Sequence, residues 1–209
     1  MINTSIVRLL VLAAILSGSS PKSALAEPLS GGNLVGALRQ GGYVLVMRHT
    51  SSPTARPSAD AADPENTNRE RQLDQVGRDT ARAMGEAVKK LGIPLGAVLS
   101  SPTYRALETV RLAAFGHAEA FAEIGDGGAS MQKISEPPAE WLRHKAAEAP
   151  RAGTDTIIIT HMPNVVAAFG DAAKGIEDGE TMVFHPDGKG GAELVARVKV
   201  EEWPKLAGQ

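Results

Sequence analysis

The chain has 209 residues, a formal net charge of −2 at pH 7 and no cysteine. This length allows one domain with a sizeable hydrophobic core and is too short for two ordinary domains. The lack of cysteine excludes disulfides, thiolate nucleophiles and Cys-ligated zinc. A mildly acidic chain without basic blocks is also a poor binder of nucleic acid and of anionic membranes.

The first 26 residues have the pattern of a secretory signal peptide. Arg8 precedes the apolar stretch Leu9–Leu16, and an A-L-A cleavage site ends at Ala26. The apolar stretch is shorter than the roughly 20 residues that span a bilayer, so we expect no stable membrane insertion. Cleavage after Ala26 would yield a periplasmic or secreted domain over residues 27–209. Its net charge would be −4, because the leader carries two basic residues and no acidic one.

In the rest of the chain, short apolar runs alternate with longer segments of helical period. This alternation predicts βαβ units around a largely parallel sheet. The predicted strands are Tyr43–Met47, Ala97–Ser100, Thr156–Thr160, Thr181–Phe184 and Glu193–Val200, and the last two form an antiparallel hairpin. The predicted helices are residues 73–92, a segment from Pro102 to about Phe115 that Ser101 caps, Pro138–Ala147 and Val165–Ala173.

Basic and imidazole side chains follow three of these strands. Arg48 and His49 come directly after the first, Arg105 lies in the first turn of the helix after the second, and His161 follows the third. Each of these residues alone would be an unremarkable surface residue. Because the carboxyl ends of parallel strands share one edge of the sheet, where ligands bind, we expect the four side chains to converge in one crevice.

The motifs at these strand ends resemble those of the histidine phosphatase superfamily. They are R-H-T at Arg48–Thr50, S-S-P-T-Y-R-A-L-E-T at Ser100–Thr109 and T-H-M-P-N at Thr160–Asn164. The resemblance extends from Gly41 to Phe169. It implies an α/β fold of the phosphoglycerate-mutase type, a three-layer sandwich with a mostly parallel central sheet.

The resemblance also implies roles for the four residues. His49 would take a phosphoryl group onto a ring nitrogen, and Arg48 and Arg105 would bind the phosphate and hold down the pKa of His49. His161 would be a further hydrogen-bond donor to the phosphoryl oxygens. The amino end of the helix from Pro102 would add free N–H groups. We expect neither cofactor nor metal, since the five histidines include no H-x-H or H-E-x-x-H spacing.

Family members usually add an acid that protonates the leaving group. The segment A-F-A-E-I-G-D-G-G contains Glu123 and Asp126, and Glu123 stands closer to the family's position. Some phosphatases of this type lack the acid altogether, so three assignments remain: Glu123, Asp126 or no protein group.

These residues predict a metal-independent phosphatase that hydrolyses phosphomonoesters or phosphoramidates, on a small phosphorylated substrate or a phosphoprotein. One alternative is a mutase-type phosphoryl transferase, but that activity needs a capping region and the Phe115–Thr156 insertion is short. Another is a non-catalytic module that binds phosphate or a phosphoprotein. Arg56, Arg69 and Arg71, in or beside the long Ser51–Arg71 loop, are candidates for holding a second anionic group or are merely solvated. The oligomeric state stays open.

Overall fold

The centre of the molecule is a six-stranded sheet with the strand order β3-β2-β4-β1-β5-β6. The computed structural model describes residues 28–126 and 135–208, so the expected signal peptide lies outside the described residues. The strands are β1 (Val44–Arg48), β2 (Leu95–Ser100), β3 (Glu119–Ala120), β4 (Asp155–Thr160), β5 (Thr181–Pro186) and β6 (Ala192–Val198). Strands β3, β2, β4 and β1 are mutually parallel, whereas β5 and β6 run antiparallel to their neighbours. The predicted α/β fold with a mostly parallel sheet is confirmed.

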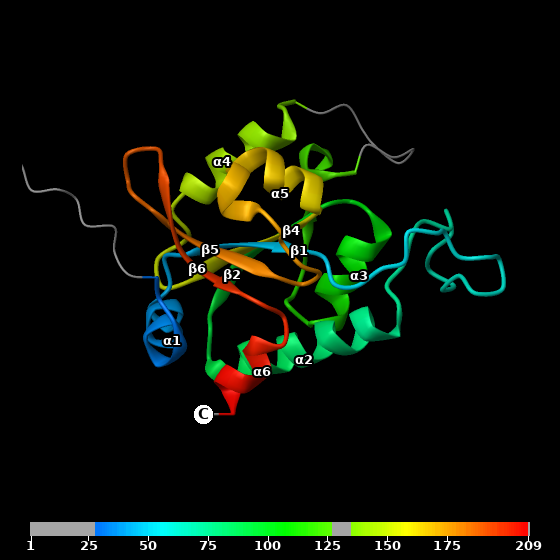
Figure 1. Cartoon of the computed structure of the whole chain (residues 1–209), viewed down its shortest axis with the longest axis horizontal. Coiled ribbons are helices and arrows are strands. Elements are labelled where there is room, and N and C mark those ends of the chain that lie inside the picture. The colour runs from blue at the N-terminus through cyan, green and yellow to red at the C-terminus, as the bar shows by residue number, and fades with distance from the viewer. Residues whose placement is uncertain (1–27, 127–134, 209) are drawn as a thin grey trace, which may run out of the picture.

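Helices cover both faces of the sheet (Figure 1). One face carries α1 (Gly31–Gln40), α2 (Gln75–Leu91), α3 (Tyr104–Leu112) and α6 (Glu202–Ala207), and the other carries α4 (Pro138–Ala147) and α5 (Met162–Phe169). Two short 3-10 helices, η1 (Ala122–Ile124) and η2 (Gly170–Ala173), complete the described elements. None of the described helices is both long and apolar enough to span a bilayer.

Strand β1 shows why the strands have continuous apolar sequences. Leu45 and Met47 join the hydrophobic cluster that contains Trp203 of α6. Val44 and Val46 join the opposite cluster, which is built on α4 and α5. Alternate side chains of a strand point to opposite faces, and here both faces are covered. A strand buried on two faces therefore reads as an uninterrupted apolar run, as expected of a parallel sheet.

The predicted strands and helices all occur, and α4 has the predicted bounds. The structure adds α1, α6 and the two-residue strand β3, none of which was predicted. The helix predicted at Val165–Ala173 begins earlier, at Met162, and its last part is η2. The antiparallel pairing of β5 with β6 confirms the predicted hairpin.

Helix α3 begins at Tyr104 rather than at Pro102, and its N-cap is Thr103 rather than Ser101. The N–H of Ser101 still pairs with the carbonyl of Ile159 in β4, at 2.8 Å. Its hydroxyl donates to the Thr103 hydroxyl at 3.1 Å instead of capping the helix. The predicted start of the helix was wrong by two residues, because the pairing of Ser101 with β4 continues the sheet beyond β2 and the chain turns into the helix only after it.

The register of the central strands aligns their carboxyl ends. Arg48 at the end of β1 is paired with Thr160 at the end of β4, and Ser100 at the end of β2 is paired with Ile159. The N–H of His49 extends this pairing by donating to the carbonyl of Thr160 at 3.0 Å. The residues that follow β1, β2 and β4 thus leave the sheet side by side.

Candidate active site

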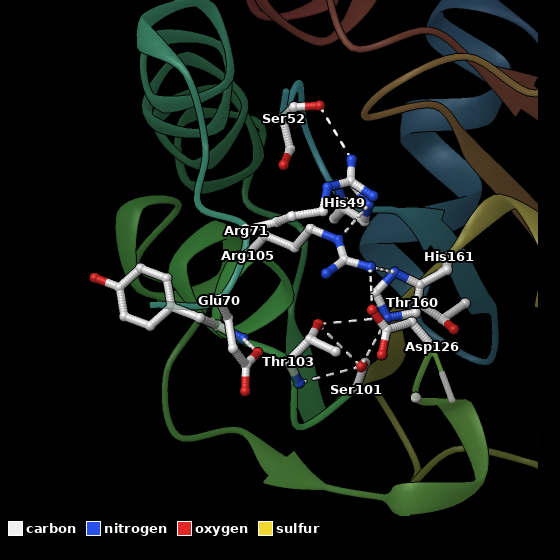
Figure 2. A network of polar contacts seen from close by, with 12 residues as sticks. His49, Ser52, Glu70, Arg71, Ser101, Thr103, Arg105, Asp126, Thr160 and His161 are labelled. Carbon is white, nitrogen blue, oxygen red and sulfur yellow. Dashed lines mark hydrogen bonds and ion pairs between the residues drawn. The ribbon is translucent and has the colours of Figure 1, made fainter. Parts of the chain in front are cut away.

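A cavity of about 560 Å³ opens at this edge of the sheet. Its lining includes Arg48, His49, Arg105 and His161, the four residues that the sequence predicts to converge. Figure 2 shows His49, Arg105 and His161 pointing toward one another, joined by hydrogen bonds. The structure therefore brings these side chains together, although they come from three separate stretches of the chain.

The hydrogen bonds of His49 define its tautomer. Its Nδ1 lies 2.7 Å from the carbonyl oxygen of Thr50, and its Nε2 lies 3.1 Å from Nε of Arg105. A carbonyl can only accept and a guanidinium can only donate. Nδ1 therefore carries the proton, and Nε2 presents its lone pair to the centre of the site.

The His49 ring is also held neutral. Its pKa is lowered from 6.5 to about 3, first by burial and then by the positive charges of Arg105, Arg48 and Arg71, against the raising effect of the Thr50 carbonyl. The sequence attributed this depression to the arginines alone, whereas loss of hydration on burial is the larger cause. A neutral imidazole, which keeps a lone pair on one ring nitrogen, is the form of histidine that can act as a nucleophile.

Arg105 is the centre of the polar network. Its side chain is almost completely buried. Besides the bond from Nε to His49, its Nη2 donates to Nδ1 of His161 at 3.0 Å and to a carboxylate oxygen of Asp126 at 2.9 Å. One planar guanidinium thus fixes two imidazole rings and a carboxylate relative to one another (Figure 2).

His161 is committed at both ring nitrogens. Since Nδ1 accepts from Arg105, Nε2 carries the proton and donates to the hydroxyl of Ser101 at 2.8 Å. Burial, followed by the charge of Arg105, lowers the pKa of His161 to about 2. In this arrangement His161 positions Arg105, and its expected role as a donor to phosphoryl oxygens stays a prediction.

Arg48, which also lines the cavity, is anchored by the segment before β5. Its guanidinium forms an ion pair with Asp178 at 2.6 Å and donates to the carbonyl of Ile176 at 3.0 Å. Asp178 had no signal in the sequence, because it lies in a loop more than a hundred positions from Arg48. The loop between η2 and β5 therefore sets the position of the first arginine.

The two candidate acids lie in different surroundings. Glu123 on η1 is absent from the cavity lining, and its carboxylate accepts from the hydroxyl of Ser135 at 2.6 Å and from the Ser135 N–H at 3.0 Å. These hydrogen bonds lower its pKa. Asp126 lines the cavity and forms an ion pair with Arg105. The structure thus brings Asp126 to the predicted site and leaves Glu123 outside it.

Helix α3 contributes less to the site than the sequence suggests. Its first amide, the N–H of Tyr104, donates to the carboxylate of Glu70 at 2.9 Å. A carboxylate from the long Ser51–Arg71 loop thus occupies this donor, which the sequence had assigned to phosphate. Of the three loop arginines, Arg71 lines the cavity, whereas Arg56 and Arg69 are exposed.

Among residues 28–126 and 135–208, no group of three or more His, Asp or Glu side chains is arranged to hold a metal ion. What the site offers is a neutral nitrogen nucleophile and three guanidinium groups around one cavity. Guanidinium groups are matched to phosphate oxygens in charge and in geometry.

Comparison with known proteins relates this arrangement to a family. A family model for the histidine phosphatase superfamily (branch 1) matches residues 44–157, whereas no curated protein matches the chain significantly. The fold is similar to that of the protein histidine phosphatase SixA complexed with tungstate, with 19% identity and a TM-score of 0.55 over 77% of this chain and 98% of the other.

Two further solved structures share the fold. A SixA protein of Agrobacterium tumefaciens, described as a putative phosphohistidine phosphatase, has 16% identity and a TM-score of 0.52 over 75% of this chain and 97% of the other. A phosphoserine phosphatase mutant of Entamoeba histolytica in complex with phosphoserine has 9% identity and a TM-score of 0.50 over 76% and 98%. At such identities the likeness concerns the fold alone. The family model spans more than half of the chain, which therefore belongs to the histidine phosphatase superfamily, branch 1.

Proposed function

We propose that the protein is a phosphatase that hydrolyses phosphomonoesters or phosphoramidates through a phosphohistidine intermediate on His49. The observation that carries the proposal is the state of His49: a neutral ring whose Nε2 lone pair faces Arg105 inside a cavity lined by three arginines. Phosphoryl transfer needs positioning and positive charge around the equatorial oxygens more than it needs covalent help from the protein.

In the first step, Nε2 of His49 attacks phosphorus, the N–P bond forms, and the bond to the leaving oxygen or nitrogen breaks with its electron pair. In the second step, water attacks phosphorus, Nε2 recovers its electron pair, and orthophosphate departs. Arg105 stabilises the charge that develops on the phosphoryl oxygens, and Arg48 provides a second guanidinium. The incoming phosphoryl group displaces the Nε–H of Arg105 from the His49 lone pair.

A leaving alkoxide needs a proton, and the geometry supports Asp126 as its source rather than Glu123. Asp126 lines the cavity with His49, whereas Glu123 is bound to Ser135. The ion pair of Asp126 with Arg105 would have to loosen for this role. Substrates whose leaving group departs without an acid, such as phosphoramidates of imidazole, avoid this requirement. The solved structures with this fold include a protein histidine phosphatase and a phosphoserine phosphatase, which supports testing both classes.

The test is to incubate the protein with labelled substrate and to look for an acid-labile, base-stable label on the chain. We expect the label and the turnover of p-nitrophenyl phosphate, an alkyl phosphate or phosphoramidate to disappear in His49→Ala. His117→Ala is the matched control, because His117 is an exposed histidine away from the cavity. Turnover in His49→Ala at the wild-type rate would contradict the proposal. Labelling without hydrolysis would favour a phosphoryl transferase, and phosphate binding without labelling would favour a binding module.

We also propose export, on the pattern of the first 26 residues. Sequencing the amino terminus of the protein recovered from the extracytoplasmic fraction should find Glu27 first. A chain that keeps Met1, or that stays in the membrane, would contradict this proposal.

A further inference from the structure

The charges of the three cavity arginines are balanced unequally. Arg48 pairs with Asp178 at 2.6 Å, and Arg105 pairs with Asp126 at 2.9 Å. For Arg71, the described part of the chain provides no carboxylate within ion-pair distance. Its Nε donates to the carbonyl of Pro53 at 2.7 Å and its Nη2 to the carbonyl of Ser52 at 3.2 Å. The hydrogen bonds of Arg71 therefore go to neutral groups, and no described carboxylate forms an ion pair with it.

The loop that carries Arg71 is fastened at its base. The hydroxyl of Ser51 donates to the carboxylate of Asp74 at 2.7 Å, and the N–H of Leu73 donates to buried Glu108 at 3.0 Å. With its own two bonds to backbone carbonyls, the Arg71 guanidinium has a fixed place at the cavity (Figure 2). A donor held in place before the ligand arrives loses little conformational entropy on binding.

Arg71 is also close enough to act on the reacting centre. It lines the same cavity as His49 and His161. Its charge contributes to the lowered pKa of each of these rings. Burial and the neighbouring charge of Arg105 lower the pKa of Arg71 itself, whereas the charges of Asp126 and Asp178 raise it, although neither carboxylate lies at ion-pair distance from Arg71.

We propose that Arg71 is a third guanidinium ligand of the phosphoryl group and, as the arginine of the three without an ion pair, supplies most of the positive charge that draws a phosphate dianion into the cavity. The carboxylates on Arg48 and Arg105 repel an incoming dianion and offset part of the attraction of those two arginines. Arg71 has no carboxylate at ion-pair distance among the described residues, so its attraction is offset less than that of the other two arginines. This inference rests on the proposed function only in taking the cavity as a phosphate site, and it requires no turnover.

The experiment measures binding of inorganic phosphate to the purified protein by titration calorimetry. Arg71→Ala and Arg71→Gln should each weaken binding by about 10–100-fold, the value of a hydrogen bond to a charged group. Arg71→Lys should restore part of the affinity, because it returns the charge without the planar geometry. Arg56→Ala is the matched control: it removes the same charge from an exposed position of the same loop and should change affinity by less than about twofold.

Salt dependence separates a charge effect from a structural one. Added sodium chloride should weaken phosphate binding to the wild type more steeply than to Arg71→Gln, since the variant has lost one attracting charge. A loop that merely collapsed would lower affinity without this loss of salt dependence. Thermal unfolding checks that each variant is folded, and if Arg71→Ala is not, Arg71→Gln decides.

Three results would overturn the inference: wild-type affinity in the neutral variants, an equal loss in Arg56→Ala, or no phosphate binding by the wild-type protein. The proposed phosphatase activity is measured separately. If the protein turns over substrate but the Arg71 variants bind phosphate as tightly as the wild type, this inference is refuted and the proposed phosphatase activity is not. Phosphate binding that depends on Arg71, in a protein without turnover, would refute the phosphatase and leave the inference standing.

Discussion

Replacing Arg105 is the most direct perturbation of the site, because this side chain joins His49, His161 and Asp126. Arg105→Ala removes all three of these contacts from a buried position. Losing one preorganised donor to developing charge typically lowers the rate about 10²–10³-fold, and we expect at least this loss in kcat/KM. Arg105→Lys keeps one charge but cannot bond two imidazoles and a carboxylate at once, so it should recover only part of the activity.

The assay is steady-state hydrolysis of p-nitrophenyl phosphate, with kcat and KM reported separately. A loss mainly in kcat would place the contribution of Arg105 in the transition state, and a loss mainly in KM would place it in ground-state binding. Arg111→Ala is the matched control, since Arg111 is an exposed arginine on the same helix. It should change kcat/KM by less than about twofold.

Full activity of Arg105→Lys would refute the reasoning. It would mean that the planar, multiple hydrogen bonding seen around Arg105 does not matter for catalysis. Equal losses of activity in Arg105→Ala and Arg111→Ala would also refute it. The loss would then come from removing any positive charge from this helix rather than from the contacts of Arg105.

Three further predictions follow from the titratable groups. If Asp126 is the general acid, Asp126→Asn should slow the hydrolysis of alkyl phosphates by about 10²–10⁴-fold and leave the hydrolysis of aryl phosphates nearly unchanged, and Glu123→Gln should affect neither. The reverse pattern would make Glu123 the acid, and small, equal losses in both variants would mean that no protein acid acts. Because the pKa of His49 is lowered to about 3, kcat/KM should show no fall between pH 8 and pH 5 from protonation of the nucleophile. A loss centred near pH 6.5 that persists with a substrate whose own ionisation does not change in this range would contradict the burial argument. Burial raises the pKa of Asp155 from 3.8 to about 7, so between these pH values the folded state binds a proton that the unfolded state has lost, and the free energy of unfolding should fall as the pH rises. In urea unfolding, Asp155→Asn should therefore be more stable relative to the wild type at pH 8 than at pH 5. The same difference in stability at both pH values would contradict this prediction.

The sequence alone was enough to predict the architecture and the convergence of Arg48, His49, Arg105 and His161. Strand and helix periodicity is a local property, since it arises from the direction of successive side chains. Once the strands are parallel, their carboxyl ends must meet at one edge of the sheet. Helix α6 escaped prediction because it has only 6 residues, and packing of buried Trp203 against the core stabilises so short a helix. Helix α1 is as long as α4, but the glycines in its sequence disfavour a helix locally.

Only the tertiary structure decided which polar partners each site residue has. Asp126 rather than Glu123 reaches Arg105, Asp178 holds Arg48, and Arg71 lies in the cavity while its loop neighbour Arg56 does not. The direction of a loop side chain depends on contacts with distant segments, such as the bonds from Arg71 to Ser52 and Pro53, and no local pattern encodes them. Contacts across the fold also moved the start of α3, because the pairing of Ser101 with β4 extends the sheet beyond β2 and the helix begins only at Tyr104.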